Sequence, residues 1–258
     1  MILVVFEGKE REVDIFNALK QLFFSDEEVI VEFTYNTRFH TLYKNLIEND
    51  MSLFRVLQEA SRKRENDTLG AYREDDFSEV YLFFDYDFHF RFIPLEQWNE
   101  NLREMLDYFD DETKNGKMYV NYPMVESIRY TKLLPDKDYY TYTVKRDECP
   151  KKKGDPTSGF KYMAAQFSAY PGLDFIQINE NKTIEDRKAV LQNWKYLKRQ
   201  NVAKANYLCT GRNTFPKKKR LFAQLEILDA QCRKYVQSDP CCVSILNSFP
   251  IFLYEYFK

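Results

Sequence analysis

The sequence predicts an α/β protein, with a four-stranded parallel sheet flanked by helices and then a mostly helical, basic region. Short apolar runs alternate with helical periodicity through the first half, and two of these runs end in carboxylates. The charge also changes sign midway along the chain. With 44% hydrophobic and 30% charged residues over 258 positions, the composition is that of a globular protein rather than a disordered chain.

The elements follow in a regular order. We expect strands at 2–6, 29–35, 79–85 and 117–120, a helix around 13–23, one or two helices over 41–63, a polar loop at 64–78 and a helix from 94 to about 109. This alternation of strands and helices is typical of a parallel sheet covered by helices on both faces. Beyond about 130 we expect an extended insertion at 131–160 and mainly helical periodicity from 160 to 232.

Two strand ends carry acidic residues. Glu7 and Gly8 follow the first strand, and the third expected strand ends in Asp85-Tyr86-Asp87. If these strands are neighbours, the three carboxylates converge, and alternate positions of an extended segment would point Asp85 and Asp87 the same way. Any one carboxylate alone is explained as a strand-end cap, whereas all three together favour a Mg²⁺ (or Mn²⁺) site. Two such ions ~4 Å apart can support phosphodiester cleavage.

The halves of the chain have opposite charge. Residues 1–130 hold 15 Lys and Arg against 27 Asp and Glu, and residues 131–258 hold 23 against 13. We therefore divide the chain into an acidic metal-binding domain, 1–130, and a basic region, 131–258, that would bind a polyanionic substrate or a partner. The plainer interpretation is that the two halves simply attract each other.

Two basic runs are candidate nucleic-acid contacts. The first lies in an expected loop near Tyr139, Tyr140, Tyr142, Lys145 and Arg146, an interleaving that can hold phosphates and stack bases. The second is expected to begin a helix after Pro216, where positive charge is unfavourable without an anion. Both runs are equally consistent with solvated surface. They comprise Lys151, Lys152, Lys153, Lys217, Lys218, Lys219 and Arg220.

The remaining features restrict the setting. Five cysteines without a repeated Cys-x-x-Cys pair, no apolar run of membrane length and a first strand close to Met1 lead us to expect a cytoplasmic protein with no signal peptide and no membrane contact. With only His40 and His89, zinc is not expected. His89, two residues after Asp87, could contact a metal-bound water or a leaving group, but an ordinary loop histidine is the favoured interpretation. The aromatic C-terminus is either a buried last element or a surface for a second copy of the chain or another partner.

The acidic clusters resemble the Toprim domain. A first-strand glutamate followed by glycine and a helix, then Asp-x-Asp after a later strand, is its signature, and the resemblance covers about residues 1–130. Toprim domains occur in topoisomerases, bacterial primases, ribonuclease M5 and the overcoming-lysogenisation-defect (OLD) nucleases. The resemblance implies metal-dependent cleavage of DNA or RNA, with Glu7, Asp85 and Asp87 as metal ligands and catalytic residues.

Two details refine the resemblance. The segment from Asn121 to Glu126 is similar to an Asn-Pro-x-x-Glu-like segment of RloB-type Toprim proteins, which implies an accessory role for Glu126. OLD-type proteins carry an acidic residue four positions after the first glutamate, but here that position is Arg11. Its neighbours Glu10 and Glu12 are the candidate replacements, so one metal is better supported than two.

Related small Toprim proteins act in phage defence, including the nuclease effector of PARIS, which works with a separate ATPase. The resemblance therefore implies an endonuclease, an antiviral effector of abortive infection acting on DNA or RNA (tRNA included), controlled by a partner ATPase. No P-loop pattern occurs in this chain. The alternatives are a housekeeping RNA-processing endonuclease similar to ribonuclease M5 and a non-catalytic scaffold or binding subunit.

Overall fold

The computed structural model describes residues 1–64, 67–178, 182–217 and 220–257. The first half contains β1 (Ile2–Phe6), α1 (Arg11–Phe23), β2 (Ile30–Thr34), α2 (Phe39–Tyr43), α3 (Leu53–Arg62), β3 (Glu79–Asp85), α4 (Leu95–Tyr108), β4 (Asp110–Asp111) and β5 (Gly116–Asn121). The second half contains β6 (Thr143–Lys145), α5 (Phe160–Phe167), α6 (Ile184–Thr210), α7 (Gln224–Gln231), β7 (Cys242–Ser244) and α8 (Ser248–Tyr256).

The main sheet has the strand order β2-β1-β3-β5-β4. Its first four strands are parallel, as the sequence predicts, and β1 lies between β2 and β3. The prediction of four strands was incomplete, because the two-residue strand β4 pairs antiparallel with β5 at the edge. Two residues carry too little pattern to be recognised as a strand.

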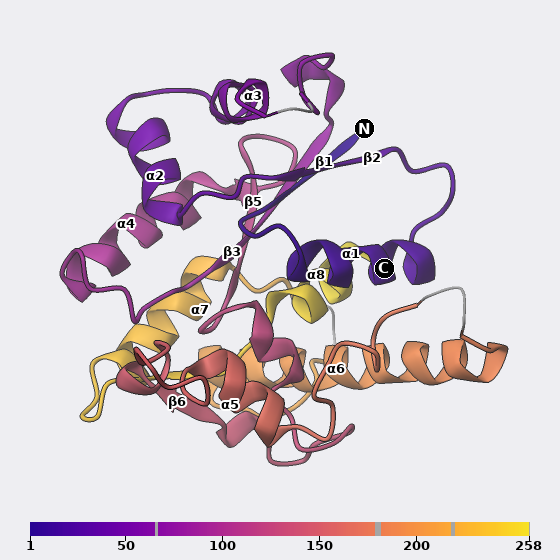
Figure 1. Cartoon of the computed structure of the whole chain (residues 1–258), viewed down its shortest axis with the longest axis vertical. Coiled ribbons are helices and arrows are strands. Elements are labelled where there is room, and N and C mark those ends of the chain that lie inside the picture. The colour runs from indigo at the N-terminus through magenta and orange to yellow at the C-terminus, as the bar shows by residue number, and fades with distance from the viewer. Residues whose placement is uncertain (65–66, 179–181, 218–219, 258) are drawn as a thin grey trace.

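Helices cover both faces of the sheet, which confirms that expectation (Figure 1). On one face, Phe83 of β3 stacks on Phe249 of α8 with ring centroids 4.3 Å apart, and Phe16 of α1 packs beside Phe83. On the other face, Phe84 meets Phe39 of α2, which contacts a tryptophan of α4. Adjacent strand residues thus face opposite layers, as the pleat of a strand requires.

The second half packs on the first. The aromatic C-terminus forms helix α8, so the interpretation as a buried last element is correct from Phe249 to Tyr254, whereas Tyr256 and Phe257 are half-buried. α8 packs against α1, β5 and the long helix α6, and buried apolar side chains of both halves form one continuous core. β6 and β7 pair antiparallel, which joins the expected insertion at 131–160 to the segment before α8.

Among the described residues, the helix expected after Pro216 does not begin where the sequence predicts. The segment after Pro216 does not begin a helix at Lys217, and the next helix along the described chain, α7, starts at Gln224. Lys218 and Lys219 lie outside the described residues. A run of lysines has no apolar periodicity to bury, so nothing in it stabilises a helix through packing.

Candidate active site

The sheet brings Glu7 next to Asp85. Glu7 directly follows β1 and Asp85 is the last residue of β3, and these two strands are hydrogen-bonded neighbours. The backbone amide of Asp85 donates a hydrogen bond to Oε2 of Glu7 at 2.9 Å. Both carboxylates therefore lie at the carboxyl edge of a parallel sheet, where ligands bind in such folds.

Asp87 also lines this cavity, but its backbone conformation differs from the extended one that we expected. β3 ends at Asp85, and Asp87 has a positive φ of 46°, in the left-handed region. The expectation that Asp85 and Asp87 occupy alternate positions of one extended strand was therefore wrong. Asp87 instead lies in a turn, and its own backbone amide donates a hydrogen bond to the carbonyl of Pro123 at 3.1 Å. Aspartate tolerates this conformation better than most residues, so the sequence spacing did not reveal the turn.

Glu12 is a fourth acidic residue of the cavity. It lies in the first turn of α1, is 5% exposed, and its Oε1 accepts a hydrogen bond from the amide of Gly8 at 3.2 Å. A Cβ atom at Gly8 would lie only 2.7 Å from Oε2 of Glu12, so glycine leaves the space that this carboxylate fills. Of the two candidate replacements at the OLD-type position, Glu12 is buried in the cavity, whereas Glu10 is exposed at its rim beside Arg11.

The second half of the chain contributes a cation to this cavity. Lys161, in the first turn of α5, forms an ion pair with the buried Glu126 at 3.1 Å. Burial by itself would lower the pKa of Lys161, but Glu126, Asp85 and Glu12 raise it on balance. Oε2 of Glu126 has no hydrogen-bond partner among the described residues. No sequence motif singled out Lys161, because its position depends on α5 folding back over the sheet edge.

The concentration of carboxylates shifts their protonation. Burial raises the pKa of Glu7 to about 8, and the charges of Asp87 and Glu12 add to this shift. The pKa of Asp85 is raised well above its usual range by burial and by the neighbouring carboxylates. Burial also raises the pKa of Glu12 and that of Asp87. Ionising all four together is unfavourable without a compensating cation.

His89 and Arg38 border Asp87. Nδ1 of His89 lies 3.8 Å from Oδ1 of Asp87, too far for a hydrogen bond, and has no hydrogen-bond partner among the described residues. Burial lowers the pKa of His89, and the charge of Asp87 partly offsets this shift. The positive charges of His89, Lys161 and Arg38 oppose the rise in the pKa of Asp87.

The donor chemistry of the cavity fits a hard divalent cation. Its volume is about 410 Å³, and its acidic lining offers carboxylate oxygens, the ligands that Mg²⁺ prefers. Across the described part of the chain, however, no three Asp, Glu, His or Cys side chains are grouped as a ready coordination shell. A bound cation would thus require side-chain rotation of Glu7, Asp85 and Asp87, and it would relieve the repulsion that raises their pKa values.

A buried polar network holds Asp85 in place. Nδ2 of Asn121, at the end of β5, donates to Oδ1 of Asp85 at 3.1 Å. Oδ1 of Asn121 in turn accepts from the backbone amide of Ser248 at 3.0 Å and from its hydroxyl at 2.8 Å. The N-terminus of α8 thereby orients the amide that binds Asp85, although these residues are 163 positions apart in the numbering of the chain.

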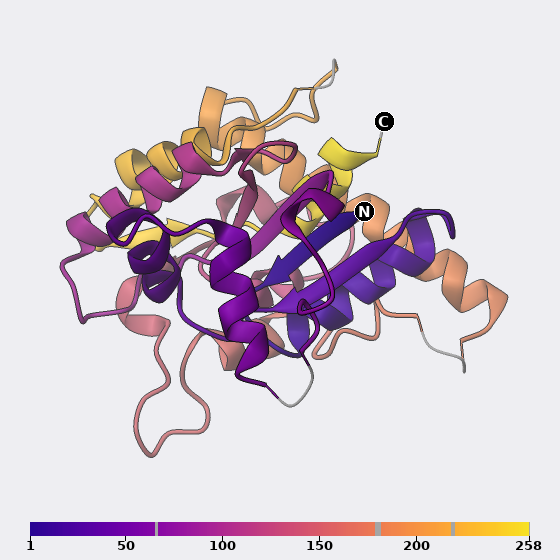
Figure 2. The same ribbon diagram turned by 90° about the horizontal axis from the view of Figure 1, so that it is seen from above.

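The candidate nucleic-acid contacts are only partly available. Lys151, Lys152 and Lys153 are exposed in the loop between Cys149 and α5, which projects from the body of the protein in Figure 2. Lys217 is also exposed, but Arg220 forms an ion pair with Glu226 at 2.6 Å.

Two residues near the first run have structural roles instead. Tyr139 is 2% exposed and cannot stack on a base, which limits the interleaved pattern that the sequence suggested. Arg146 donates hydrogen bonds to the carbonyls of Phe88 and Phe90, at 2.6 and 2.9 Å, and so fixes the turn that follows Asp87.

The fold and the site together define an α/β protein with a carboxylate-lined cavity at the carboxyl edge of a mostly parallel sheet. No protein-family model, no curated protein and no solved structure matches this chain. Among the described residues, no helix is both long enough and apolar enough to cross a membrane.

Proposed function

We propose that this chain is a metal-dependent endonuclease with a Toprim-like catalytic half, hydrolysing phosphodiester bonds in DNA or RNA. The observation that carries the proposal is the convergence of Glu7, Glu12, Asp85 and Asp87 in one cavity, with the pKa of each raised. Buried carboxylates with strongly shifted pKa values are typical of catalytic or metal-binding sites.

The residues have distinct roles in this proposal. Glu7, Asp85 and Asp87 would hold Mg²⁺ or Mn²⁺, which when bound would neutralise charge on a phosphate in the cleavage step. Glu7, whose pKa is raised to about 8, would be the group that holds or moves a proton at the reacting atoms. Lys161 is the cation placed to contact a substrate phosphate, and Glu126 orients its ammonium group.

The basic second half supports a polyanionic substrate. Residues 131–258 carry ten more basic than acidic side chains, and the exposed Lys151, Lys152 and Lys153 lie on the loop that leads into α5, the helix of Lys161. A phosphate backbone running from this loop to the cavity would meet basic side chains along its length.

We further propose that the enzyme is an effector of antiviral defence in the cytoplasm, held inactive by a partner ATPase until infection. This part of the proposal is supported by the resemblance to OLD-type, RloB-type and PARIS nucleases in Glu7-Gly8 and Asp85-Tyr86-Asp87. The five cysteines are unpaired, which suits a reducing compartment. A housekeeping nuclease similar to ribonuclease M5 would use the same site.

The scaffold alternative is favoured by one observation, the lack of a ready coordination group among the described side chains. A binding subunit would use the same fold without chemistry at Glu7. The two functions differ in whether the cavity takes up a divalent cation and whether nucleic acid is cleaved.

The test compares wild type with Glu7→Gln and with Glu27→Gln, an exposed matched control. End-labelled single-stranded DNA, duplex DNA, RNA and tRNA are incubated with Mg²⁺ or Mn²⁺, with the partner ATPase present where one is encoded nearby. We expect wild type and the control to cleave, and Glu7→Gln to lose about a hundredfold or more of the rate. Absence of cleavage from every substrate, or equal cleavage by Glu7→Gln, would reject the nuclease proposal.

A further inference from the structure

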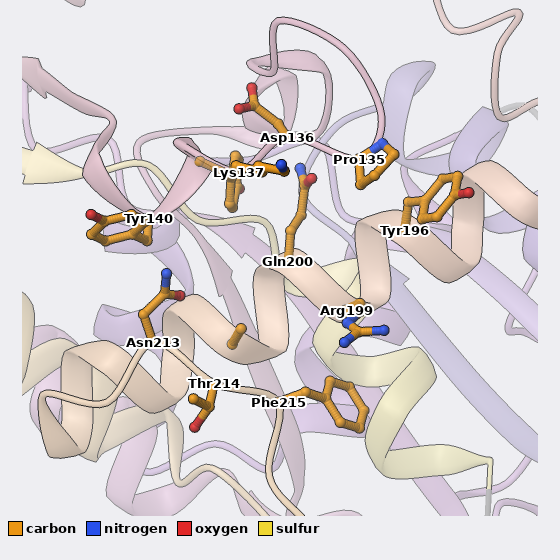
Figure 3. Close-up of a pocket in the computed structure, with 12 residues that line it drawn as sticks. Pro135, Asp136, Lys137, Tyr140, Tyr196, Arg199, Gln200, Asn213, Thr214 and Phe215 are labelled. Carbon is orange, nitrogen blue, oxygen red and sulfur yellow. The ribbon is translucent and has the colours of Figure 1, made fainter.

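A second cavity lies in the basic half, away from the carboxylates. It has a volume of about 400 Å³ and is formed by α6, the segment 135–140 and the segment 213–215 (Figure 3). None of its lining residues also lines the acidic cavity. Its size falls at the lower end of the range for small-molecule sites, about 300–1,000 Å³.

The unusual feature of this cavity is Gln200. Its side chain is 9% exposed, yet neither Nε2 nor Oε1 has a hydrogen-bond partner among the described residues. In Figure 3 the amide extends from α6 toward the segment 135–140, with Tyr140 on one side and Tyr196 on the other. Both amide atoms are themselves buried in this structure, and a buried amide without partners costs free energy. A ligand that moves aside the side chains covering this amide, and that offers a donor and an acceptor in return, would recover that cost.

The walls of the cavity are aromatic and its rim is basic. Tyr140, Tyr196 and Phe215 supply ring surface, and Phe215 is 37% exposed. Lys137 and Arg199 are exposed, and neither forms an ion pair with another residue in the described ranges. The combination of ring faces and unpaired cations matches a ligand with a planar ring and an anionic group.

The carboxylate that lines this cavity does not oppose an anion strongly. The Tyr142 hydroxyl lies 3.1 and 3.0 Å from the two oxygens of Asp136 and shares its single proton between them, and the amide of Lys132 donates to Oδ2 at 2.8 Å. In Figure 3 its carboxylate points away from Gln200. Asp136 therefore shapes the loop rather than the ligand site.

We propose that this cavity binds one nucleotide, with the base against Gln200 between the aromatic side chains and the phosphate at Lys137 and Arg199. A carboxamide can form two hydrogen bonds with a base edge that presents a donor beside an acceptor. Base stacking on tyrosine and phenylalanine supplies affinity. The inference does not depend on the nuclease proposal, since it concerns other residues and requires no metal.

Binding is measured by calorimetry with AMP, GMP, CMP and UMP, on full-length protein carrying Glu7→Gln in EDTA, so that cleavage cannot interfere. Gln200→Leu removes the amide at nearly constant volume, and Gln192→Leu is the matched control on an exposed position of the same helix. Arg199→Gln removes the cation, with Arg187→Gln as its exposed control. We expect Gln200→Leu and Arg199→Gln each to weaken binding by about tenfold or more, and the controls to leave it unchanged.

A ten-nucleotide single strand distinguishes the two sources of a nucleotide. If the strand binds about a hundredfold more tightly than a mononucleotide, the ligand is a nucleic-acid strand. If the two bind equally tightly, the ligand is a free nucleotide. Either result supports the proposed site. The proposal is overturned if no mononucleotide or strand binds saturably at millimolar concentration. It is also overturned if Gln200→Leu and Arg199→Gln, folded as judged by their thermal unfolding, bind as tightly as the controls.

Discussion

At the scale of single residues, the carboxylates of the acidic cavity are defined by what surrounds them. The pKa of Glu7 is raised because this side chain is buried in one cavity with Asp85, Asp87 and Glu12. Hydrogen bonds from the backbone of Asp85 and Phe39 stabilise the ionised form of Glu7 only in part. The protonation of Glu7 is therefore a sensitive measure of how much negative charge the cavity holds.

The first prediction concerns pH. The pKa of Glu7 is about 8 in the folded protein and 4.5 for an ordinary glutamate, so between these values the folded state binds the extra proton. The free energy of unfolding should therefore fall as pH rises through this window, by up to about 1.4 kcal/mol per pH unit for one proton. Urea unfolding of metal-free protein from pH 5 to pH 8 measures this slope.

Three comparisons test the assignment. Glu7→Gln should flatten the pH slope, whereas Glu27→Gln, on an exposed loop, should not. Added Mg²⁺ should also flatten it, because a cation favours the ionised carboxylates and displaces their protons. A slope that is identical in wild type and Glu7→Gln would show that Glu7 is not the group that titrates.

At the scale of elements, the ends of β3, β5 and α8 are tied together behind the cavity. Asn121 is fully buried and links Asp85 to Ser248, so the N-terminus of α8 takes part in positioning a candidate metal ligand. β3 continues only to Asp85, after which the turn at Asp87 is held by the carbonyl of Pro123. The carboxylates thus lie at the ends of strands, and the N-terminus of α8, which is distant in sequence, helps to position Asp85.

The second prediction tests this link. Asn121→Ala leaves the amide of Ser248 and Asp85 without their shared partner, and we expect a loss of about 1–3 kcal/mol in the free energy of unfolding. Asn49→Ala, at an exposed asparagine before α3, should change it by less than about 0.5 kcal/mol. Equal effects of the two substitutions in urea unfolding would contradict a structural role for the buried network.

The third prediction concerns the packing of α8. Phe249→Ala removes a ring that is fully buried and stacked on Phe83, so we expect a cost of about 3–5 kcal/mol. Phe92→Ala is the matched control, because that ring is 81% exposed, and a change within about 0.5 kcal/mol is expected. A small effect of Phe249→Ala would mean that α8 is not docked on the sheet as described.

At the scale of the whole molecule, the acidic and basic halves share one core. The buried apolar side chains form a continuous cluster that runs from β1 to α8. Lys161 of the second half reaches the carboxylates of the first, and Arg103 of α4 pairs with Asp229 of α7 at 2.8 Å. The charge division along the sequence therefore does not coincide with a division of the hydrophobic core.

The fourth prediction follows from this shared core. A chain that ends at Tyr130 lacks α8 and exposes the face of the sheet that carries Tyr81 and Phe83, so it should be insoluble or lack a cooperative thermal transition. Deletion of 153–157, the tip of the exposed loop, should leave the thermal midpoint within a few degrees of wild type. A soluble, cooperatively unfolding 1–130 fragment would contradict the dependence of the first half on the second.

Local patterns determined much of this protein without its structure. The alternation of apolar runs and helical periods predicted β1, β2, β3 and β5 and the helices between them, because each element buries one face with its own period. The acidic ends at Glu7 and Asp85 were also recognisable, and the parallel order made their meeting a reasonable expectation. The helix expected after Pro216 does not begin at Lys217 within the described residues, and a run of charges has no apolar period that packing could stabilise.

Only the tertiary structure decided the rest. Contacts between distant parts of the chain place Lys161 beside Glu126 and link Asp85 through Asn121 to Ser248. Packing of distant segments also leaves the amide of Gln200 buried without a partner among the described residues. Such contacts leave no periodic signal, because they arise from how completed elements pack rather than from neighbours along the chain. The sequence thus determined where carboxylates would gather, and the packing of the second half determined which side chains surround them.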